Sequence, residues 1–388
     1  MAKKFLKRFL KYAFVGVLTA CLLFRADLFA FGASEASVSC FLDAYGSSAR
    51  AISCFGLRES SSVARRVDSS RYKGIRLYAG GIPFGVKFMT DGVLVIGFAE
   101  ISTDKGVKTP ARDAGLKIGD VILSVGSERI MSSSDLSAAV EKSGGKSMSV
   151  IYLREGCEQR AELSPAYSSE EGRYKSGIYV RDSGAGIGTV TYIMPETLEF
   201  GGLGHGICDG DTGKLIPMQR GSVVGVTING VVKGIVGTPG EVKGYFNSGK
   251  TGSLLKNTHC GVFGVFASLP KNLPTQPISI GLKEELQAGK AYIYSTLDGT
   301  SPQKYEIEIS AINTSACEGK CFTVKVTDPA LLAKTGGIVQ GLSGSPIIQN
   351  GKLVGAITHV MINDPTVGYG IFIENMLAAA ETSTQRAA

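Results

Sequence analysis

The stretch GLSGSPIIQNGKLVGAITH, residues 341–359, places Ser343 in the pattern Gly-x-Ser-Gly-x-Pro, directly before an apolar run. Its Asn-Gly pair, between two apolar segments, predicts a β-hairpin. A hairpin does not account for a serine between glycines with a proline close behind. Glycines at these places let the backbone turn its N–H groups toward a reacting oxygen and let a second molecule come near. The stretch therefore predicts a nucleophilic serine beside a hairpin of a β-rich domain.

The composition supports a turn-rich, mainly β protein with a few helices. The chain has 388 residues, of which 44% are hydrophobic, with 51 glycines and 13 prolines, and it is long enough for two domains and a tail. YEIEI (305–309) and FTVKV (322–326) alternate apolar and polar residues, as half-buried strands do. GSVVGVTINGVVKGIVG (221–237) holds Asn229-Gly230 between two valine-rich runs and predicts a second hairpin. Many short strands with glycine turns favour a barrel or a sandwich in the C-terminal part.

The N-terminal segment, residues 1–31, explains most of the net charge of +7. It holds six basic residues and one acid, whereas the rest of the chain has 35 basic and 33 acidic residues, so nucleic-acid binding has little support. The apolar run from Tyr12 to Phe24 comes after a basic flank and fits a signal segment or an uncleaved signal-anchor. We therefore expect membrane attachment through the N-terminus and export of the rest of the chain. Residues 32–75 are rich in Ser and Arg and predict an exposed linker where proteolytic nicking is expected.

Residues 76–166 have the pattern of one small domain. VKFMTDGVLVIGFAEI predicts two strands joined by a turn at residues 90–92, and DLSAAVEKSG predicts a helix that stops at the glycines 144–145. TPARDAGLKIGDVILSVGSERI (109–130) resembles SPAxxAGLxxGDxIxxVxG, the signature of PDZ domains.

The PDZ resemblance implies a groove that adds a peptide strand to a sheet edge and binds a terminal carboxylate through backbone N–H groups. It places the carboxylate loop at Pro83, Phe84, Gly85 and Val86, with Phe84 and Val86 lining an apolar pocket. The alternative is a PDZ fold that makes contacts only within its own chain.

A nucleophilic serine needs a base, a group that orients the base, and N–H donors for the oxyanion. Of the three histidines, His205 lies between glycines in GLGHG, which leaves an imidazole accessible, although a surface-loop histidine would look the same. His259, in KNTHCG, indicates a turn before a strand. His359 comes sixteen residues after Ser343, and we rank it below His205 because the base precedes the nucleophile in the trypsin-like order.

For the orienting acid, Asp328 closes an alternating strand fifteen residues before the serine. Its rivals are Asp209 and Asp211, which lie close to His205 in sequence, and Asp364 in an Asp-Pro pair that is typical of a turn. Spacing alone prefers Asp328 only slightly.

The backbone N–H groups of Gly341 and Ser343 are the expected oxyanion hole, and Ser345 is the alternative nucleophile. No metal ligands occur at the spacing of a zinc site. Cys317 and Cys321 are close enough in sequence to form a disulfide across a loop, but free thiols are the favoured interpretation.

Three motifs carry a wider resemblance: GLGHGICDGDTG (202–213), VTDP (326–329) and QGLSGSPIIQNGKLVGAITHVMINDPTVGYGIFIENML (340–377). Together with the N-terminal apolar segment and the PDZ signature, they are similar to the stage IV sporulation protein B family of serine peptidases. The resemblance covers about residues 75–380.

This resemblance implies a chymotrypsin-like β-barrel peptidase domain at residues 167–388, after the PDZ domain at 76–166. It assigns His205 as base, Asp328 as orienting acid and Ser343 as nucleophile, with no cofactor and no metal.

The resemblance also implies a place in endospore formation. A member of this family is exported across, or anchored in, the forespore membrane and faces the space between forespore and mother cell. It cleaves itself, then an inhibitory membrane protein of an intramembrane metalloprotease complex, and so activates a sigma factor in the mother cell. The alternative function is a non-catalytic exported PDZ scaffold that binds a membrane partner. A heat-shock-type protease is disfavoured, because its PDZ domain would come after the peptidase domain.

Overall fold

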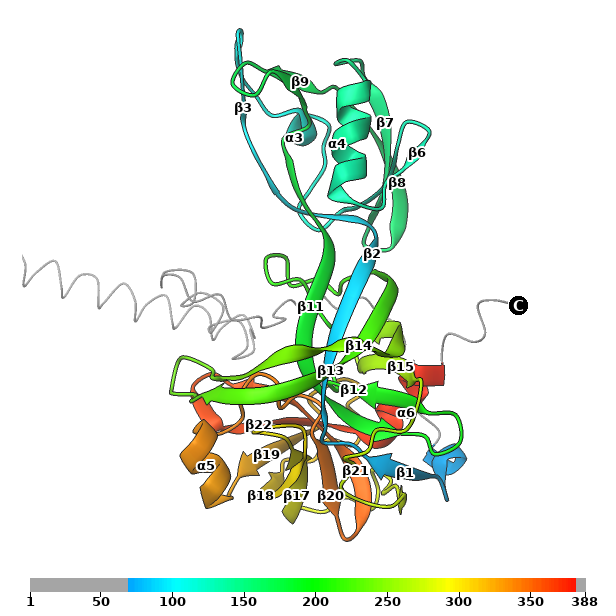
Figure 1. The fold of residues 1–388 in the computed structure, drawn as a ribbon, viewed down its shortest axis with the longest axis vertical. Coiled ribbons are helices and arrows are strands. Elements are labelled where there is room, and N and C mark those ends of the chain that lie inside the picture. Colours follow the sequence, from blue (N-terminus) through cyan, green and yellow to red (C-terminus); the bar gives the residue numbers. More distant parts are fainter. Residues whose placement is uncertain (1–68, 382–388) are drawn as a thin grey trace, which may run out of the picture. The chain divides into compact units, whose positions relative to one another are not determined.

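The computed structural model describes residues 69–381, and Figure 1 shows that this part of the chain consists mostly of strands. The expected export segment (1–31) and most of the linker (32–75) lie outside the described residues. The helices are short: the 3-10 helix η2 (Ser69–Tyr72), α3 (Pro110–Asp113), α4 (Ser133–Lys142), α5 (Pro329–Thr335) and α6 (Ile373–Glu381). Within residues 69–381, no helix is long and apolar enough to cross a membrane. The predicted mainly β fold is confirmed.

The predicted PDZ domain is a small sheet covered by one main helix. The sheet runs through the second half of β2 (Pro83–Phe98), β5 (Val121–Val125), β7 (Met148–Arg154) and β8 (Cys157–Leu163), with β6 (Glu128–Arg129) paired to β5. α4 begins after Ser132, whose hydroxyl accepts a 3.1 Å hydrogen bond from the Asp135 N–H, a favourable helix cap. Leu136 and Val140 bury the apolar face of the helix in the domain core. The predicted helix is confirmed.

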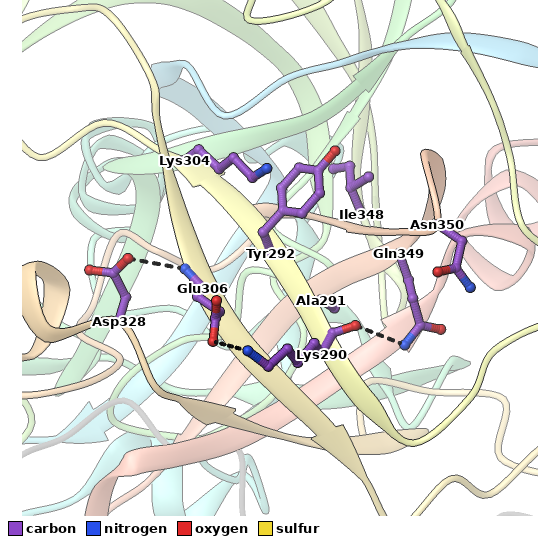
Figure 2. A pocket seen from close by; sticks show the side chains of 9 residues that line it. All are labelled: Lys290, Ala291, Tyr292, Lys304, Glu306, Asp328, Ile348, Gln349 and Asn350. Carbon is purple, nitrogen blue, oxygen red and sulfur yellow. Dashed lines mark hydrogen bonds and ion pairs between the residues drawn. The ribbon is translucent and has the colours of Figure 1, made fainter.

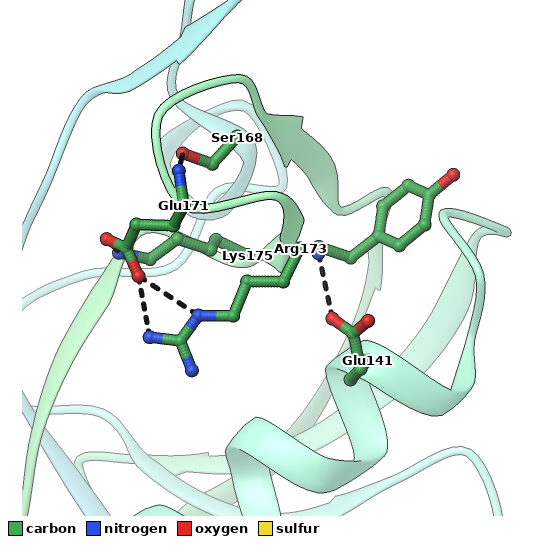
Figure 3. Close-up of polar contacts among 6 residues, drawn as sticks. Glu141, Ser168, Glu171, Arg173 and Lys175 are labelled. Atoms are coloured by element: carbon green, nitrogen blue, oxygen red, sulfur yellow. Dashed lines mark hydrogen bonds and ion pairs between the residues drawn. The ribbon is translucent and has the colours of Figure 1, made fainter.

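Two hairpins complete this part: β3 (Ile101–Thr103) with β4 (Gly106–Lys108), and β9 (Ala166–Ser168) with β10 (Arg173–Lys175). The second hairpin contacts α4, since the Glu141 carboxylate accepts a 2.8 Å hydrogen bond from the N–H of Tyr174 (Figure 3). Within that hairpin Glu171 forms ion pairs with Arg173 and Lys175.

β2 is one continuous strand, so the hairpin predicted at residues 90–92 is wrong. β11 (Ile178–Ile193) pairs with both halves of β2, from Ile178 opposite Phe98 to Thr189 opposite Pro83. The register of this ladder shifts between Arg181 and Ser183, where the extra residues of the expected turn are absorbed. The turn at residues 90–92 was predicted from neighbouring residues alone. β11, which pairs with β2 on both sides of these residues, lies some ninety residues later in the sequence.

The first half of β2 belongs to the part of the sheet in the predicted peptidase domain. That sheet has the order β16 (Ile278–Ser279), β1 (Arg76–Ala79), β11, β12 (Glu199–Gly202), β15 (Gly261–Phe266), β14 (Glu241–Thr258), β13 (Met218–Val232), β2. Phe84, Phe200 and Val223 share its buried core. The structure therefore places residues 76–90, which we expected in the PDZ domain, in the peptidase sheet.

The hairpin predicted at Asn229-Gly230 is also wrong. β13 continues through both residues and pairs with β14 from Gly221 to Val232, with an irregular register between Ile228 and Gly230. Valine-rich segments on both sides keep the strand in the ladder, and the chain turns only after β13.

Six strands form a closed barrel in the order β17 (Gly289–Ser295), β18 (Gln303–Ser310), β19 (Phe322–Val326), β22 (Asp364–Phe372), β21 (Lys352–Met361), β20 (Pro346–Gln349). Alternate residues of β18 are buried, and the Asn-Gly hairpin of the 341–359 stretch joins β20 to β21. The predicted barrel, the strands 305–309 and 322–326, and this hairpin are confirmed.

Candidate active site

Ser343 lies on a tight turn that leads into β20. Its hydroxyl donates a 2.6 Å hydrogen bond to the carbonyl of Thr358 on β21. Gly341 and Gly344, on either side, have φ values of 100° and 94°. A Cβ at Gly344 would lie 2.1 Å from the carbonyl oxygen of Thr189, so only glycine fits there. The close approach of β11 thus explains why the residue after the serine is glycine.

β11 fixes the serine turn through two buried threonines. Thr189 donates from Oγ1 to the carbonyl of Gly341 at 2.7 Å and from its N–H to the carbonyl of Ser343 at 3.2 Å. Thr191 donates from Oγ1 to the carbonyl of Gly344 at 2.8 Å. Both side chains point the same way because alternate residues of a strand share a face. Three carbonyls of the turn are therefore held in place.

Two N–H groups of the turn remain for an oxyanion. The N–H of Gly344 donates to the carbonyl of Ile357 at 2.7 Å. The N–H groups of Gly341 and Ser343, in contrast, donate to no group within residues 69–381. A preorganised pair of N–H donors beside a serine hydroxyl is what a tetrahedral oxyanion would need.

His205 lies in the loop after β12, and this loop also contacts β11, since the N–H of Leu203 donates to the carbonyl of Thr189 at 3.2 Å. Nδ1 of His205 lies 2.8 Å from the carbonyl oxygen of Gly206. Because a carbonyl only accepts, Nδ1 carries the proton and Nε2 is the free acceptor. Burial lowers the pKa of His205, and the hydrogen bond to Gly206 opposes this effect. The neutral ring required of a general base is thereby favoured.

His359 on β21, which the sequence ranked below His205 as a base, packs against His205. Its ring stacks on His205 with centroids 4.8 Å apart and an interplanar angle of 34°. Burial, then His205 and Lys320, lower the pKa of His359 to about 4. His359 comes directly after the residue whose carbonyl binds the Ser343 hydroxyl, so Ser343, His205 and His359 share one region. His259 is exposed in the turn between β14 and β15, as the sequence indicated.

Asp328 caps helix α5 instead of orienting an imidazole. Its Oδ1 accepts hydrogen bonds from the N–H groups of Ala330 and Leu331 at 2.9 and 3.0 Å, and its Oδ2 accepts one from the N–H of Glu306 at 3.2 Å. Figure 2 shows it at the edge of an open pocket of about 350 Å³. That pocket is lined by Lys290, Ala291, Tyr292, Lys304, Glu306, Asp328, Ile348, Gln349 and Asn350.

β19 separates Asp328 from the histidines. Before the strand, Gly319 lies against His359, because a Cβ there would be 3.1 Å from the ring atom Cε1. Asp328 comes after the other end of the strand, and a five-residue strand spans about 13 Å. In this structure Asp328 is not the orienting acid, which corrects the assignment made from the sequence.

The rival acids do not take that place. Asp364 accepts hydrogen bonds from the N–H and the hydroxyl of Thr366 at the start of β22. Asp209 and Asp211 form ion pairs with Arg181 on β11. Within residues 69–381, no carboxylate contributes to the pKa of His205.

Asn257 is a further residue of this region that no sequence pattern indicated. Its side chain accepts a 2.8 Å hydrogen bond from the N–H of Ile207 and donates to the carbonyls of Ile207 and Ile216 at 2.8 and 3.0 Å. It thus fixes the backbone two residues after His205. A lone asparagine near the end of a strand carries no pattern that could have revealed this.

The residues expected to bind a peptide carboxylate, Pro83 to Val86, lie inside β2. All four pair with β11, and Phe84, Gly85 and Val86 also pair with β13 on the other side, so the backbone of these three residues is enclosed in the sheet. Phe84 is buried and contacts Phe200 edge-on at 5.5 Å. The carboxylate-loop prediction is therefore wrong, because a long-range strand pairing draws these residues into the peptidase core.

Cys317 and Cys321 are free thiols, as favoured from the sequence. Burial raises the pKa of Cys321 to about 11, although hydrogen bonds from its surroundings oppose the shift. No group of three or more potential metal ligands occurs in the part of the chain that the structure describes.

The family model described as SpoIVB peptidase S55 matches residues 172–377, and a PDZ-domain model matches residues 104–154. No curated protein sequence matches the chain. The PDZ domain, with a chymotrypsin-like, β-barrel-type peptidase domain after it, was predicted from the sequence and is confirmed.

Among solved structures, the chain is similar to the PDZ domain of the SdrC-like protein from Listeria monocytogenes, with 22% identity over 23% of this chain and 87% of that one and a TM-score of 0.19. The Rv3671c protease from M. tuberculosis in its active form has 14% identity over 50% and 72%, with a TM-score of 0.28. The HtrA-type protease AlgW with tripeptide has 13% identity over 51% and 56%, with a TM-score of 0.30.

Proposed function

Since this chain belongs to the SpoIVB peptidase S55 family and is a serine peptidase that carries a PDZ domain, we propose that it is an endopeptidase with Ser343 as nucleophile and His205 as general base. The observation that carries this proposal is the serine turn. There, β11 holds the carbonyls of Gly341 and Ser343 while their N–H groups stay available for an oxyanion.

The reaction begins with a rotation of the Ser343 side chain. Its hydroxyl leaves the carbonyl of Thr358, where it rests in this structure, and donates to Nε2 of His205. Hydrogen bonds in resting enzymes often reach their working geometry only when substrate binds. Ser343 Oγ then attacks the peptide carbonyl as its proton passes to His205. The proton moves on to the leaving amine, and water, deprotonated in turn by His205, releases the acyl group.

The carbonyl of Gly206 does the orienting work in this proposal. It accepts from Nδ1 of His205 at 2.8 Å and so selects the tautomer that leaves Nε2 free. Like a carboxylate it favours the imidazolium that forms during attack, but without a full negative charge its effect is smaller. No metal and no cofactor takes part in these steps.

The biological role that we propose is the one that the family resemblance implies. The protein would be exported across or anchored in the forespore membrane, cleave itself in the linker 32–75, and then cleave an inhibitory membrane protein of an intramembrane metalloprotease complex. Membership of the family and the Ser- and Arg-rich composition of the linker support this role.

Self-processing tests the proposal. The full chain, Ser343→Ala and Ser345→Ala would be expressed in parallel, and N-terminal fragments monitored by gel and mass spectrometry. We expect shortening of the parent and of Ser345→Ala only, with fragment masses that map within residues 32–75. Equal shortening of all three proteins would assign the cleavage to a host protease.

A non-catalytic PDZ scaffold is the second candidate, favoured by one observation: the Ser343 hydroxyl binds a backbone carbonyl instead of an imidazole. A fluorophosphonate probe separates the two functions. Covalent labelling of the parent but not of Ser343→Ala supports the peptidase, whereas absence of labelling in both supports the scaffold.

A further inference from the structure

Two consecutive residues of β11, Arg181 and Asp182, connect different parts of the molecule. Arg181 reaches the loop that carries His205, with Nε 2.5 Å from Oδ2 of Asp209 and Nη2 2.8 Å from Oδ2 of Asp211. Asp182 faces the other way, as neighbours in a strand do, and accepts hydrogen bonds at 2.9 Å from both the N–H and the hydroxyl of Ser133.

The ion pair between Arg181 and Asp209 joins β11 to the loop that carries His205. The Asp209 side chain is fully buried, whereas Arg181 is 37% exposed. Oδ1 of Asp209 accepts hydrogen bonds from the N–H groups of Asp211 and Thr212 at 3.1 and 2.8 Å, which shapes the turn after the histidine. A buried carboxylate needs a compensating charge, and Arg181 supplies it.

The contact between Asp182 and Ser133 joins the PDZ helix to the same strand. Ser133 is the first residue of α4, and an acid at a helix N-terminus is favoured by the helix dipole and by N–H groups that lack partners in the helix. These hydrogen bonds lower the pKa of Asp182. Seven residues after Asp182, on the same strand, Thr189 holds the serine turn.

We propose that Arg181 is a positioning residue for His205, and that Asp182 ties the PDZ helix α4 to the same support, so that a change at the PDZ domain alters catalysis through β11. The inference rests on the proposed function and deepens it by naming how the site is regulated. It extends beyond the residues that touch substrate, because Arg181 acts only through the loop 205–212.

The contacts predict what loss of Arg181 does. The loop loosens, His205 gains contact with water, and its pKa rises, because burial is the first cause of its low value. The groups near it are His359 from β21 and, beyond that ring, Lys320 from the loop before β19. We expect kcat to fall while KM stays unchanged, since displacing a catalytic group by 1 Å can cost about 100-fold in rate.

The first experiment compares the parent with Arg181→Met, Arg181→Lys and Arg181→Met/Asp209→Asn, using turnover of a peptide reporter and thermal unfolding. Arg181→Met alone leaves a buried carboxylate unpaired and lowers the Tm. The double variant removes both charges, so we expect its Tm to recover while kcat stays about tenfold or more below the parent. Arg181→Lys, which can reach one carboxylate but not both, should be intermediate. Arg160→Met, at an exposed ion pair of β8, is the matched control. A double variant that recovers both Tm and kcat would overturn the proposal.

A second readout does not need activity. The chain has three histidines, so the imidazole of His205 can be assigned by NMR in the Ser343→Ala background with His205→Gln as reference. We expect a higher His205 pKa in Arg181→Met/Asp209→Asn than in its parent, and an unchanged pKa would contradict the positioning role. If the parent shows no turnover that depends on Ser343, the proposed function fails, yet this titration still decides the role of Arg181.

The link to the PDZ helix is tested with Asp182→Ala against Asp135→Ala. Both residues cap the start of α4, but Asp135 does so from within the helix segment, by accepting from the N–H of Met131 at 3.0 Å. We expect Asp182→Ala to lower kcat and to raise the pKa of His205, and Asp135→Ala to change neither. If the two variants have equal effects, the contact between Asp182 and Ser133 only caps α4. The proposed link from α4 through β11 to His205 would then be wrong.

Discussion

The hydroxyl of Ser343 and the carbonyl of Thr358 are joined by a 2.6 Å hydrogen bond, which holds the nucleophile against the strand that carries His359. In this structure the Ser343 hydroxyl donates to that backbone carbonyl, and β11 holds the turn around it. Under the proposed mechanism, the Ser343 side chain rotates toward His205 while β11 fixes the backbone around the serine.

Ser343→Ala should abolish turnover, whereas Ser345→Ala should not. Loss of a serine nucleophile costs roughly 10⁶-fold in such enzymes. The Ser345 hydroxyl is buried and makes no hydrogen bond among the described residues, so its removal costs little. Steady-state turnover of a peptide reporter by both variants checks this. A large loss in Ser345→Ala with an unchanged Tm would assign the nucleophile to Ser345.

The activity should persist to mildly acidic pH. The base must be neutral, and burial lowers the pKa of His205 below the ordinary value of about 6.5. Protonation therefore removes activity only as the pH falls through this lowered pKa. We expect the acidic limb of kcat/KM against pH to have its midpoint below about 6.5. A midpoint above that value would show an imidazole stabilised in its charged form, as a nearby carboxylate would do.

Asp328→Ala should lower stability more than rate. The substitution removes an N-cap of α5, which costs about 1 kcal/mol of folding free energy, and leaves the region around His205 unchanged. Chemical denaturation and turnover, measured on the same preparation, check this. A loss of several orders of magnitude in kcat at an unchanged free energy of unfolding would mean that Asp328 reaches the imidazole in a different, active conformation.

Thr189→Val should lower kcat about tenfold, because a small displacement of oxyanion donors is costly. Valine keeps the shape of the side chain but loses the hydrogen bond to the carbonyl of Gly341. Thr189→Ser, which retains the hydroxyl, should restore most of the rate. Measurement of kcat and KM separates this effect from substrate binding. Equal activity of the two variants would show that the Thr189 hydroxyl does not contribute to the rate.

Phe84→Ala should destabilise the peptidase part. A buried phenylalanine truncated to alanine costs about 3–5 kcal/mol, and Phe84 is packed against Phe200 in the sheet core. Denaturant unfolding checks the magnitude. If the variant keeps its stability and loses only binding of C-terminal peptides, Phe84 lines a peptide groove as the sequence first indicated.

Local chemistry made much of the site predictable. Glycines around Ser343 and His205 mark places where another segment packs too close for a Cβ atom. The residue type at the position itself therefore indicates the close approach. The alternating strands of the barrel were predictable for a similar reason, because a period of two records which face is buried.

Choices between similar local signals were not predictable. His205 and His359 stack although they lie more than 150 residues apart, and nothing in the spacing of either reports the other. From the sequence, Asp328 is an acid at the end of a predicted strand. Only the path of β19 shows that Asp328 follows the end of the strand that is farther from the histidines.

The sequence by itself determined the nucleophile motif, the order of the two domains and their β character, since each depends on residues within one short segment. Only the tertiary structure decided what surrounds them: that Phe84 and Val86 are core, that β11 supports the serine turn, and that Arg181 pairs with the His205 loop. The physical reason is the long ladder between β2 and β11. Its register is set by packing on both faces of the sheet, and residues distant in sequence supply that packing.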